Sequence, residues 1–313
     1  MKTHRLRIGI SSCLLGQEVR WDGAHKRDAW LSGILGRYVE WAAVCPEVDM
    51  GLPAPREPMN LVRRNGKIHL TADAGRTDLS RRLRAFAAGR LAALDDICGY
   101  VLKSRSPSCG AFGVRVRDDR GRVARNGRGL FAEALLRRFP CLPVEEESGL
   151  ACPRRRENFI RRIFTYYRWR AMASSGASPQ AIRRFHDRHR YLILAHGRAA
   201  LARLERVAGA VEYFRLLFRA LSRTPSLGNH AYALSRLAGQ LECSEHRRVD
   251  GAIEAYRCGR APLTSPLSLM RRYADRSRNA ALRKQVYLYP HPDEWALLKQ
   301  VSAAAPRGSF TGA

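Results

Sequence analysis

Short apolar runs alternate with helical patterns along the first half of the chain, and this alternation limits the folds open to it. The apolar runs cover residues 7–10, 41–44, 97–102 and 112–116, a length that suits buried strands. Helical periodicity covers residues 79–94 and 130–138. Strands that alternate with helices are typical of an α/β layer, so we expect an N-terminal α/β domain with a mostly parallel sheet.

The second half of the chain changes character near residue 157. Helical patterns cover residues 157–170, 179–207, 208–222, 229–243, 247–258 and 266–284, and no strand pattern precedes Gln285. We therefore expect an all-α C-terminal domain. The boundary is expected in a loop at 145–156, which contains Gly149 and Pro153. The sequence thus predicts two domains, residues 1–150 and 151–313.

Basic residues outnumber acidic residues in both halves. The chain has 56 Lys and Arg against 28 Asp and Glu. Residues 1–150 carry 26 basic and 17 acidic residues, and residues 151–313 carry 30 and 11, a net charge of +19. A field of this sign points to a polyanionic partner, most simply nucleic acid, and favours the second domain as the part that binds it. Genome composition is the alternative source of part of the arginine excess.

The distribution of apolar residues bears on location. No apolar run reaches the length of a membrane span, and the apolar stretch before Cys13 is too short for a signal peptide. We therefore expect a cytoplasmic protein that does not enter a membrane, with its oligomeric state left open. In a reducing compartment, its eight cysteines are expected to be free thiols, metal ligands or catalytic groups.

Three of these cysteines share one sequence context. Cys13, Cys45 and Cys109 each follow a predicted strand and are flanked by Ser, Pro or Gly. Such positions meet beyond the carboxyl ends of parallel strands, so we expect the three thiolates to converge. Soft thiolates select iron–sulfur clusters, zinc or copper(I). A [4Fe–4S] cluster normally takes four cysteines, so three would leave one iron open, as a Lewis-acid catalyst requires. The other five cysteines are interpreted mainly as small buried side chains.

Polar side chains gather at the same predicted loops. A carboxylate beside cations can act as a general base, and a serine can hold a leaving group or a water. The candidate catalytic residues are Glu47, Ser104 and Lys103. The candidate substrate-binding residues are Asp22, His25, Lys26, Ser106 and Ser108. Turn formation is the alternative role for the Ser-Pro-Ser and Asp-Gly segments among them.

Longer motifs carry a resemblance to a known family. The runs SSCLLG, VRWDGAHKR, VCPEVDMGLPAPREP and KSRSPSCG, with the acidic triplet of PVEEESGL, resemble the thiouracil desulfidase family over residues 5–148. Trp21 stands where the family pattern has Tyr, and Ala24 where it has Gly. Residues 155–295 resemble the YbgA-type helical domain through RENFIRRIFTYYRW, FHDRHRYLILAH, YRCGRAPLTSPLSLMRRY and QVYLYPHP. The fusion of the two is similar to bacterial desulfidases that act on 4-thiouridine in tRNA.

This resemblance implies a non-redox desulfuration that depends on an iron–sulfur cluster. It implies that Cys13, Cys45 and Cys109 hold a [4Fe–4S] cluster and leave one iron open for the thiocarbonyl sulfur of the substrate. Water then attacks the base carbon, uridine is released, and sulfide stays briefly on the cluster. The implied partner is therefore tRNA that carries 4-thiouridine.

The resemblance also implies roles for the polar candidates. Glu47 matches the carboxylate of the family and would transfer protons. Ser104 is the best match for the catalytic serine of the family, with Ser106 and Ser108 as close rivals. Lys103 would steady the developing charge.

A thiolated nucleotide inside tRNA would give the basic second domain a role, because phosphate contacts supply most of the non-specific affinity for nucleic acid. Arginines interleaved with aromatic rings can bind phosphates and stack on bases. The candidate RNA-binding residues are Arg154, Arg155, Arg156, Arg161, Arg162, Arg168, Trp169 and Arg170, with Tyr166 and Tyr167 among them. The alternative is an amphipathic helix that buries its rings and leaves its arginines in solvent.

Two other functions stay open at this point. One keeps the chemistry and acts on free 2- or 4-thiouracil. The other is a non-enzymatic RNA-binding protein whose cysteines hold a structural metal. Release of sulfide from thiolated tRNA or from the free base would separate these three functions.

Overall fold

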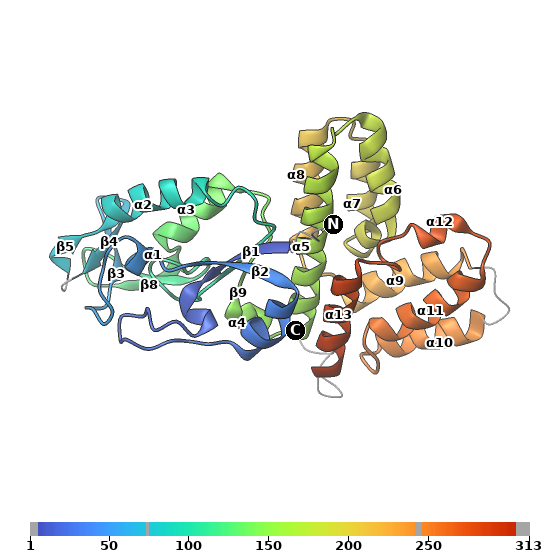
Figure 1. The fold of residues 1–313 in the computed structure, drawn as a ribbon, viewed down its shortest axis with the longest axis horizontal. Helices are drawn as coiled ribbons and strands as arrows, with labels where there is room; N and C mark the ends of the chain where they lie inside the picture. Colours follow the sequence, from blue (N-terminus) through green and yellow to red (C-terminus); the bar gives the residue numbers. More distant parts are fainter. Residues whose placement is uncertain (1–5, 73–74, 242–245, 305–313) are drawn as a thin grey trace. The chain divides into compact units, whose positions relative to one another are not determined.

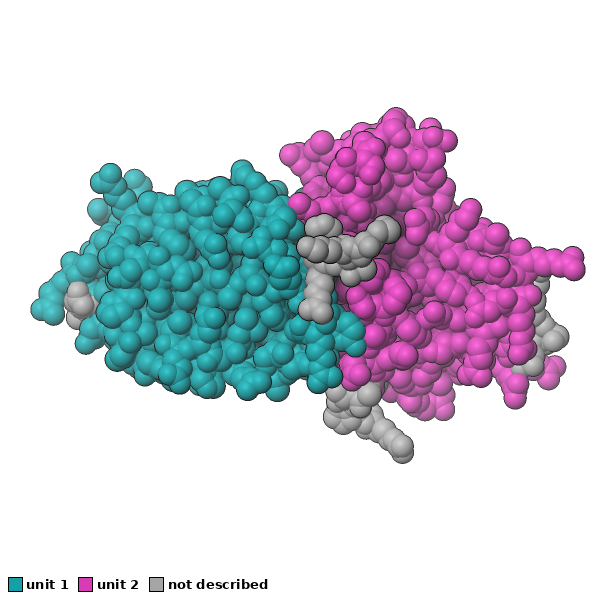
Figure 2. All heavy atoms as spheres, viewed as in Figure 1, with its two compact units in different colours: residues 1–151 teal, residues 152–313 magenta. Residues whose placement is uncertain are grey.

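The computed structural model describes residues 6–72, 75–241 and 246–304, and Figure 1 traces the chain. The chain divides into two compact units, residues 1–151 and 152–313, shown in teal and magenta in Figure 2. Within the described residues, no helix is both long and apolar enough to cross a membrane. The first unit mixes strands with helices, and the described part of the second contains helices but no strands.

A parallel sheet forms the centre of the first unit. Its strands are β1 (Leu6–Ser11), β2 (Val39–Val44), β6 (Tyr100–Leu102) and β9 (Val144–Glu146), in the order β2-β1-β6-β9. Every pair in it is parallel. Three of the four predicted strands belong to this sheet, and most of their apolar side chains are buried. Because the strands run in one direction, the loops after them meet at one edge of the sheet.

The helical periodicity predicted two helices of this unit, which correspond to α2 (Ser80–Ala92) and α3 (Leu130–Arg138). The unit also contains α1 (Pro46–Asp49) and α4 (Glu147–Leu150), with the short helical turns η1 (Ser12–Leu15), η2 (Trp30–Ile34) and η3 (Leu35–Arg37). Figure 1 shows α2 and α3 side by side. The expected α/β architecture with a mostly parallel sheet is therefore confirmed.

A second sheet of mixed direction was not predicted. Its strands are β3 (Asn60–Arg64), β4 (Lys67–Ala72), β5 (Thr77–Asp78), β7 (Val114–Arg117) and β8 (Val123–Gly127), in the order β5-β4-β3-β7-β8. The predicted strand at 112–116 corresponds to β7 and thus lies outside the parallel sheet. Asn65 and Gly66, with φ of 49° and 75°, make the tight turn between β3 and β4. An Asn-Gly pair favours this turn because both of its central residues need positive φ.

The segment at 145–156 is not the loop that the sequence predicted. It contains most of β9, all of α4 and the beginning of α5 (Pro153–Ser174). Its strand is short and its helix has a single turn, so neither has enough residues to show a periodic pattern. This difference matters because the end of β9 and the start of α4 place Glu146 and Glu147 in the region of the candidate site.

The second unit is built from helices throughout its described residues. After α5 come α6 (Pro179–Ala195), α7 (Arg198–Glu205), α8 (Ala210–Leu221), α9 (Leu227–Ala238), α10 (His246–Arg257), α11 (Thr264–Arg276), α12 (Ala280–Arg283) and α13 (Pro292–Ala304). Ser178 begins α6 as its N-cap, because its hydroxyl accepts a hydrogen bond from the Ala181 amide at 3.2 Å. The single helix expected at 179–207 is divided at Gly197, whose φ is 133°. The all-α expectation is confirmed for the described residues, and α13 was not predicted.

Candidate active site

A cavity of about 400 Å³ lies in the first unit where β1, β2 and β6 end. Cys13 reaches it from η1, Cys45 from the N-terminus of α1, and Cys109 from the loop after β6. All three cysteines are buried, with only 6 to 8% of each residue exposed. The convergence expected from the parallel strands thus occurs. Residues separated by up to 96 positions in the numbering line one cavity.

The three thiols affect one another electrostatically. Burial raises the pKa of Cys13 to about 11, and Cys45 adds to the rise, whereas Lys103 opposes it. Burial also raises the pKa of Cys45. For Cys109, burial raises the pKa well above its usual value, a hydrogen bond with Ser11 opposes the rise, and Cys45 and Cys13 add to it. Without a compensating cation the three side chains therefore stay neutral thiols at neutral pH.

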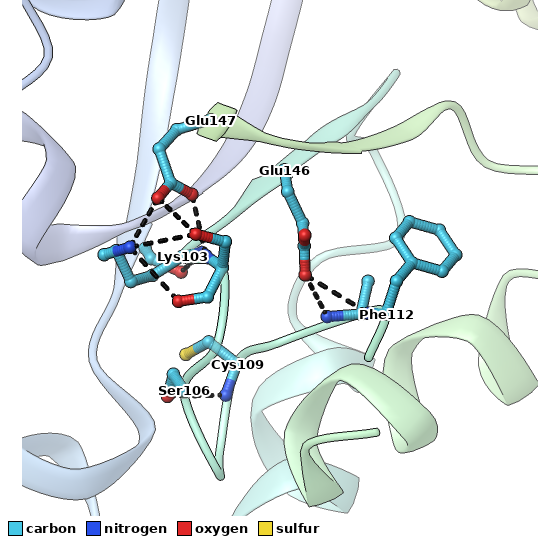
Figure 3. A network of polar contacts seen from close by, with 9 residues as sticks. Lys103, Ser106, Cys109, Phe112, Glu146 and Glu147 are labelled. Carbon is cyan, nitrogen blue, oxygen red and sulfur yellow. Dashed lines mark hydrogen bonds and ion pairs between the residues drawn. The ribbon is translucent and has the colours of Figure 1, made fainter. Parts of the chain in front are cut away.

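Lys103, Ser104 and Glu147 form a compact polar network, and Figure 3 shows Lys103 and Glu147 in the region of Cys109. The Ser104 hydroxyl donates to Glu147 Oε1 at 2.7 Å, and the Ser104 amide donates to Oε2 at 2.7 Å. The Lys103 ammonium pairs with Glu147 Oε1 and donates to Ser104 Oγ at 3.1 Å. Lys103 and Ser104 line the cavity, and Glu147 is not among the lining residues. The network places a carboxylate behind the serine.

Glu146 fixes the backbone of the loop that carries Cys109. Its Oε1 accepts hydrogen bonds from the amides of Ala111 at 2.8 Å and Phe112 at 3.2 Å (Figure 3). On the other side of the cysteine, Ser106 Oγ accepts from the Cys109 amide at 3.0 Å. Cys109 is therefore held between two anchored turns, which fixes the direction of its side chain.

Glu47 lines the cavity with a buried cation as its partner. Arg56 Nη2 pairs with the Glu47 carboxylate and also donates to the Val19 carbonyl at 3.1 Å, while Nη1 donates to the Pro53 carbonyl at 2.9 Å. The side chains of Arg56 and Glu47 are 6% and 14% exposed. Burial lowers the pKa of Arg56, with Cys45 among the groups that oppose this shift. The pair holds Glu47 as a carboxylate at the cavity wall.

Comparison with known proteins now decides the family. Residues 8–147 match the family model described as 2-thiouracil desulfurase, and residues 185–292 match that of DUF1722, a protein family of unknown function. The uncharacterized protein YbbK of Bacillus subtilis (strain 168) is 32% identical over 111 residues, which are 33% of this chain and 73% of YbbK. The chain belongs to the 2-thiouracil desulfurase family. The resemblance seen in the motifs is therefore confirmed, together with the attached helical domain.

A solved structure is also similar to part of this family member. It is described as the [4Fe-4S]-dependent thiouracil desulfidase TudS and is 38% identical, with a TM-score of 0.37. The match covers 47% of this chain and 94% of the TudS chain.

Of the five candidate substrate-binding residues, two line the cavity and three do not. Lys26 and Ser106 line the cavity. Asp22 lies outside it and pairs with Arg20 at 2.9 Å. His25 also lies outside it, with Nδ1 3.2 Å from the Arg27 amide that donates to it. Ser108 is fully buried away from the cavity lining. These last three residues are placed by turns and packing.

Several lining residues were missed by the sequence analysis. Arg20, Trp21 and Arg105 line the cavity beside Lys26, and Trp21 is 48% exposed. Arg56 and Glu147 are not lining residues. Arg56 pairs with Glu47, and Glu147 accepts a hydrogen bond from Ser104. The acidic triplet after residue 144 was a visible signal for Glu147, whereas nothing in the sequence marks Arg56 as the partner of Glu47.

The structure corrects the expected RNA-binding face of α5. Arg161 and Arg162 are only 2% and 7% exposed, and Trp169 packs against the rings of Tyr213 and Phe185. Arg161 pairs with Glu157 at 3.2 Å. These side chains form the interior of the helical unit, so they cannot form an exposed surface for RNA.

The remaining arginines of this group have mixed exposure. Arg168 is partly buried and pairs with Glu294 at 2.7 Å, and Arg154 donates to the Pro225 carbonyl at 2.8 Å. Arg155 is exposed, and Arg156 and Arg170 are partly exposed. Each of these last three has an interaction within the protein. RNA binding by these residues stays a prediction.

Proposed function

We propose that the chain is an iron–sulfur-dependent desulfidase that converts 4-thiouridine in tRNA to uridine and releases sulfide. The observation that carries the proposal is the set of three buried thiols around one cavity that also contains Glu47, Lys103 and Ser104. Membership of the 2-thiouracil desulfurase family supports removal of sulfur from a thiolated pyrimidine.

The chemistry of the thiols fits an iron–sulfur cluster. Three soft donors surround a cavity, and their raised pKa values mean that a cationic centre must replace their protons for them to ionise. In the described part of the chain, no three His, Cys, Asp or Glu side chains close on a position for one metal ion. In a cluster each thiolate holds a separate iron, so its ligands need not close on one point. Cys13, Cys45 and Cys109 are the residues that would hold it.

When bound there, a [4Fe–4S] cluster with three cysteine ligands supplies an iron with an open position, a Lewis acid for the thiocarbonyl sulfur. The chain provides the polar groups around it. Glu47, held as a carboxylate by Arg56, can take a proton from a water in the cavity. The Lys103 ammonium lies in the same wall and stabilises negative charge as it develops on the base.

The positive charge of the chain supports a nucleic acid, and not a free base, as the substrate. Arg20, Lys26 and Arg105 line the cavity together with the exposed ring of Trp21. Cations beside an exposed aromatic ring suit a phosphate backbone and a stacked base. The helical half adds a net charge of +19, from 30 basic and 11 acidic residues in 151–313. A base within tRNA would enter the cavity unstacked from its neighbours.

Turnover of matched substrates tests the proposal. The protein, reconstituted with iron and sulfide under anaerobic conditions, is given thiolated tRNA, free 4-thiouracil or free 2-thiouracil. We expect sulfide release and conversion to uridine with tRNA at the highest kcat/KM. Preference for a free base would overturn the tRNA assignment alone, and the absence of sulfide release from all three would overturn the desulfidase function.

A pair of cysteine variants tests the cluster. Cys109→Ser should reduce bound iron and the visible absorbance of the reconstituted protein, because it removes one of the three thiolates. Cys98→Ser is the matched control, since Cys98 is 2% exposed in the same unit but does not line the cavity. Equal iron contents in the two variants would contradict the assigned ligands.

Salt dependence tests the contribution of charge. The affinity for tRNA should fall steeply as salt rises. Binding releases cations that are condensed on the phosphates, and this release becomes less favourable at higher salt. We expect a loss of roughly a hundredfold or more between low and physiological salt if several phosphates are contacted. An affinity that does not change over this range would contradict binding through the basic surface.

A further inference from the structure

We propose that Ser104 and Glu147 form a proton relay in the desulfuration reaction, in which Ser104 Oγ takes a proton from the attacking water while its own proton passes to Glu147. The relay deepens the proposed function and rests on it. Glu147 was not among the candidate residues of the sequence analysis. The direction of three hydrogen bonds and the position of the two side chains relative to the cavity support the relay.

The partners of Ser104 fix the direction of its hydroxyl proton. An ionised carboxylate only accepts hydrogen bonds, so Ser104 Oγ must donate to Glu147 Oε1, 2.7 Å away. An ammonium only donates, so Lys103 Nζ donates to Ser104 Oγ at 3.1 Å. One lone pair of Oγ is then occupied and one stays available. Because Ser104 lines the cavity, it presents an acceptor to a water or a substrate there.

The backbone amide of Ser104 holds the Glu147 carboxylate against the Ser104 hydroxyl. The Ser104 amide donates to Glu147 Oε2 at 2.7 Å while the hydroxyl bonds to Oε1. The two bonds orient both oxygens of the carboxylate toward one residue. Glu147 is 15% exposed, and Ser104 is 8% exposed. The pair is therefore largely shielded from water, which strengthens these contacts.

The two carboxylates of the site lie at different depths. Glu47 lines the cavity and meets its contents directly, whereas Glu147 is not a lining residue and bonds to Ser104 and Lys103, which are. A proton from the cavity thus reaches Glu147 through the serine hydroxyl. A hydroxyl group within hydrogen-bond reach of a base is the general arrangement in which the base takes up the hydroxyl proton.

The proton balance of hydrolysis suits such a relay. Exchange of C=S for C=O consumes one water, gives its oxygen to the base carbon, and leaves both of its protons on the released sulfur, as hydrogen sulfide. In the relay, the O–H bond of water breaks as a new O–H bond forms at Ser104, and the original Ser104 proton bonds to Glu147. The second water proton stays on the attacking oxygen until the new C=O bond forms and then passes to the Glu47 carboxylate. The relay in reverse and Glu47 return the two protons to the leaving sulfur. No oxidant or reductant is consumed.

Lys103 makes the transfer electrostatically favourable. At rest, its positive charge and the negative charge of Glu147 balance within the network. Protonation of Glu147 leaves the network with a net positive charge while negative charge develops on the attacked base. The net positive charge of the network and the negative charge on the base attract each other across Ser104, and this attraction stabilises both.

Glu147→Gln is the principal test, because glutamine keeps an oxygen that can accept from Ser104 but does not take up the proton. We expect kcat to fall about 100-fold or more, with KM changed by no more than about threefold, in line with general acid–base catalysis. Bound iron should match that of the unmodified protein. Glu133→Gln is the matched control, since it removes an exposed carboxylate of the first unit that does not line the cavity.

A double variant distinguishes a relay from separate contributions. Ser104→Ala should lower kcat by a similar factor, and Ser104→Ala combined with Glu147→Gln should be about as slow as either single variant, because both break the same path. Ser104→Thr keeps a hydroxyl and should recover part of the rate. Comparison of Ser104→Thr with Ser104→Ala tests the relay if Glu147→Gln does not fold or does not bind iron.

The outcomes separate the relay from the proposed function. If the unmodified protein releases sulfide and Glu147→Gln retains its kcat, the relay is overturned and the desulfidase function stands. A fall in kcat equal to that of Glu133→Gln, or multiplicative losses in the double variant, also overturns it. If the unmodified protein releases no sulfide from any thiolated substrate, it is the proposed function that fails.

Discussion

Tyr100 fills the space that a side chain at Gly9 would occupy. The two residues are register partners on the adjacent strands β6 and β1. A Cβ atom built at Gly9 would overlap the Tyr100 ring atoms Cδ2 and Cε2. Tyr100 is completely buried, and its ring packs against Phe131 with centroids 6.0 Å apart. Glycine is therefore required here by packing against the ring in the centre of the parallel sheet.

Gly9→Ala should destabilise the first unit. The added methyl group must displace the Tyr100 ring or the backbone of β1, and overpacking of this kind costs about 1–3 kcal/mol. Urea unfolding followed by circular dichroism measures the change. Gly33→Ala is the control, since a Cβ there meets no atom within 4 Å. Equal unfolding midpoints for the two variants would contradict the packing argument.

Tyr100→Phe should behave differently from other buried tyrosine variants. The Tyr100 hydroxyl is buried without a hydrogen-bond partner, so in protein prepared without iron its removal should leave the free energy of unfolding unchanged or raise it. Tyr213→Phe is the comparison, because the Tyr213 hydroxyl lies 3.0 Å from His186 Nδ1. Its loss should cost about 0.5–1.5 kcal/mol. A larger cost for Tyr100→Phe than for Tyr213→Phe would contradict the assignment.

The sequence predicted the parallel sheet and the position of the three cysteines for a physical reason. Short apolar runs identify buried strands, and parallel strands bring the residues after them to one edge, so the convergence of Cys13, Cys45 and Cys109 needed no further information. The pattern does not identify the partner of each strand. β7, in which buried Val alternates with exposed Arg, pairs with β3 and β8 in the second sheet and not with the strands of the parallel sheet.

Long-range polar pairs were beyond sequence reasoning. Arg56 follows Glu47 by nine residues in an irregular segment, and Glu147 is 43 residues from Ser104. No periodicity connects such pairs. Arg161 and Arg162 were misread for another reason: α5 is buried over a continuous run from Asn158 to Tyr166, so these two arginines did not mark an exposed face. A helix buried on all sides belongs to the interior of its domain.

Replacement of Arg56 by methionine should be strongly destabilising. Arg56→Met leaves the Glu47 carboxylate buried without its cation, and breaking a buried ion pair costs about 3–5 kcal/mol. The free energy of unfolding in urea measures this. Arg138→Met should cost less than about 1 kcal/mol, because Arg138 and its partner Asp95 are 53% and 62% exposed.

A double variant checks the cause of this loss. Glu47→Met combined with Arg56→Met removes both charges, so it should be more stable than Arg56→Met alone. If the double variant is the less stable of the two, the cost of Arg56→Met does not come from an unpaired carboxylate.

Acid should weaken the helical unit through its buried histidines. His189 accepts a hydrogen bond from Arg168 Nε at 3.0 Å, and its Nδ1 bonds to the Phe185 carbonyl at 2.7 Å, so protonation would place two cations together. Burial, followed by Arg168, lowers the pKa of His189 well below its usual value, and burial and Arg161 do the same for the pKa of His230. The folded protein thus keeps both rings neutral where the unfolded chain binds protons.

The sign of the pH effect follows from these lowered pKa values. Below about pH 6.5, the unfolded chain takes up protons that the folded state does not, so the free energy of unfolding should fall by up to about 1.4 kcal/mol per pH unit for each histidine. Urea unfolding at a series of pH values measures the slope. His189→Gln should make the slope shallower, whereas His25→Gln, at an exposed position in the first unit, should not. A slope that is the same in all three proteins would show that other groups control the acid response.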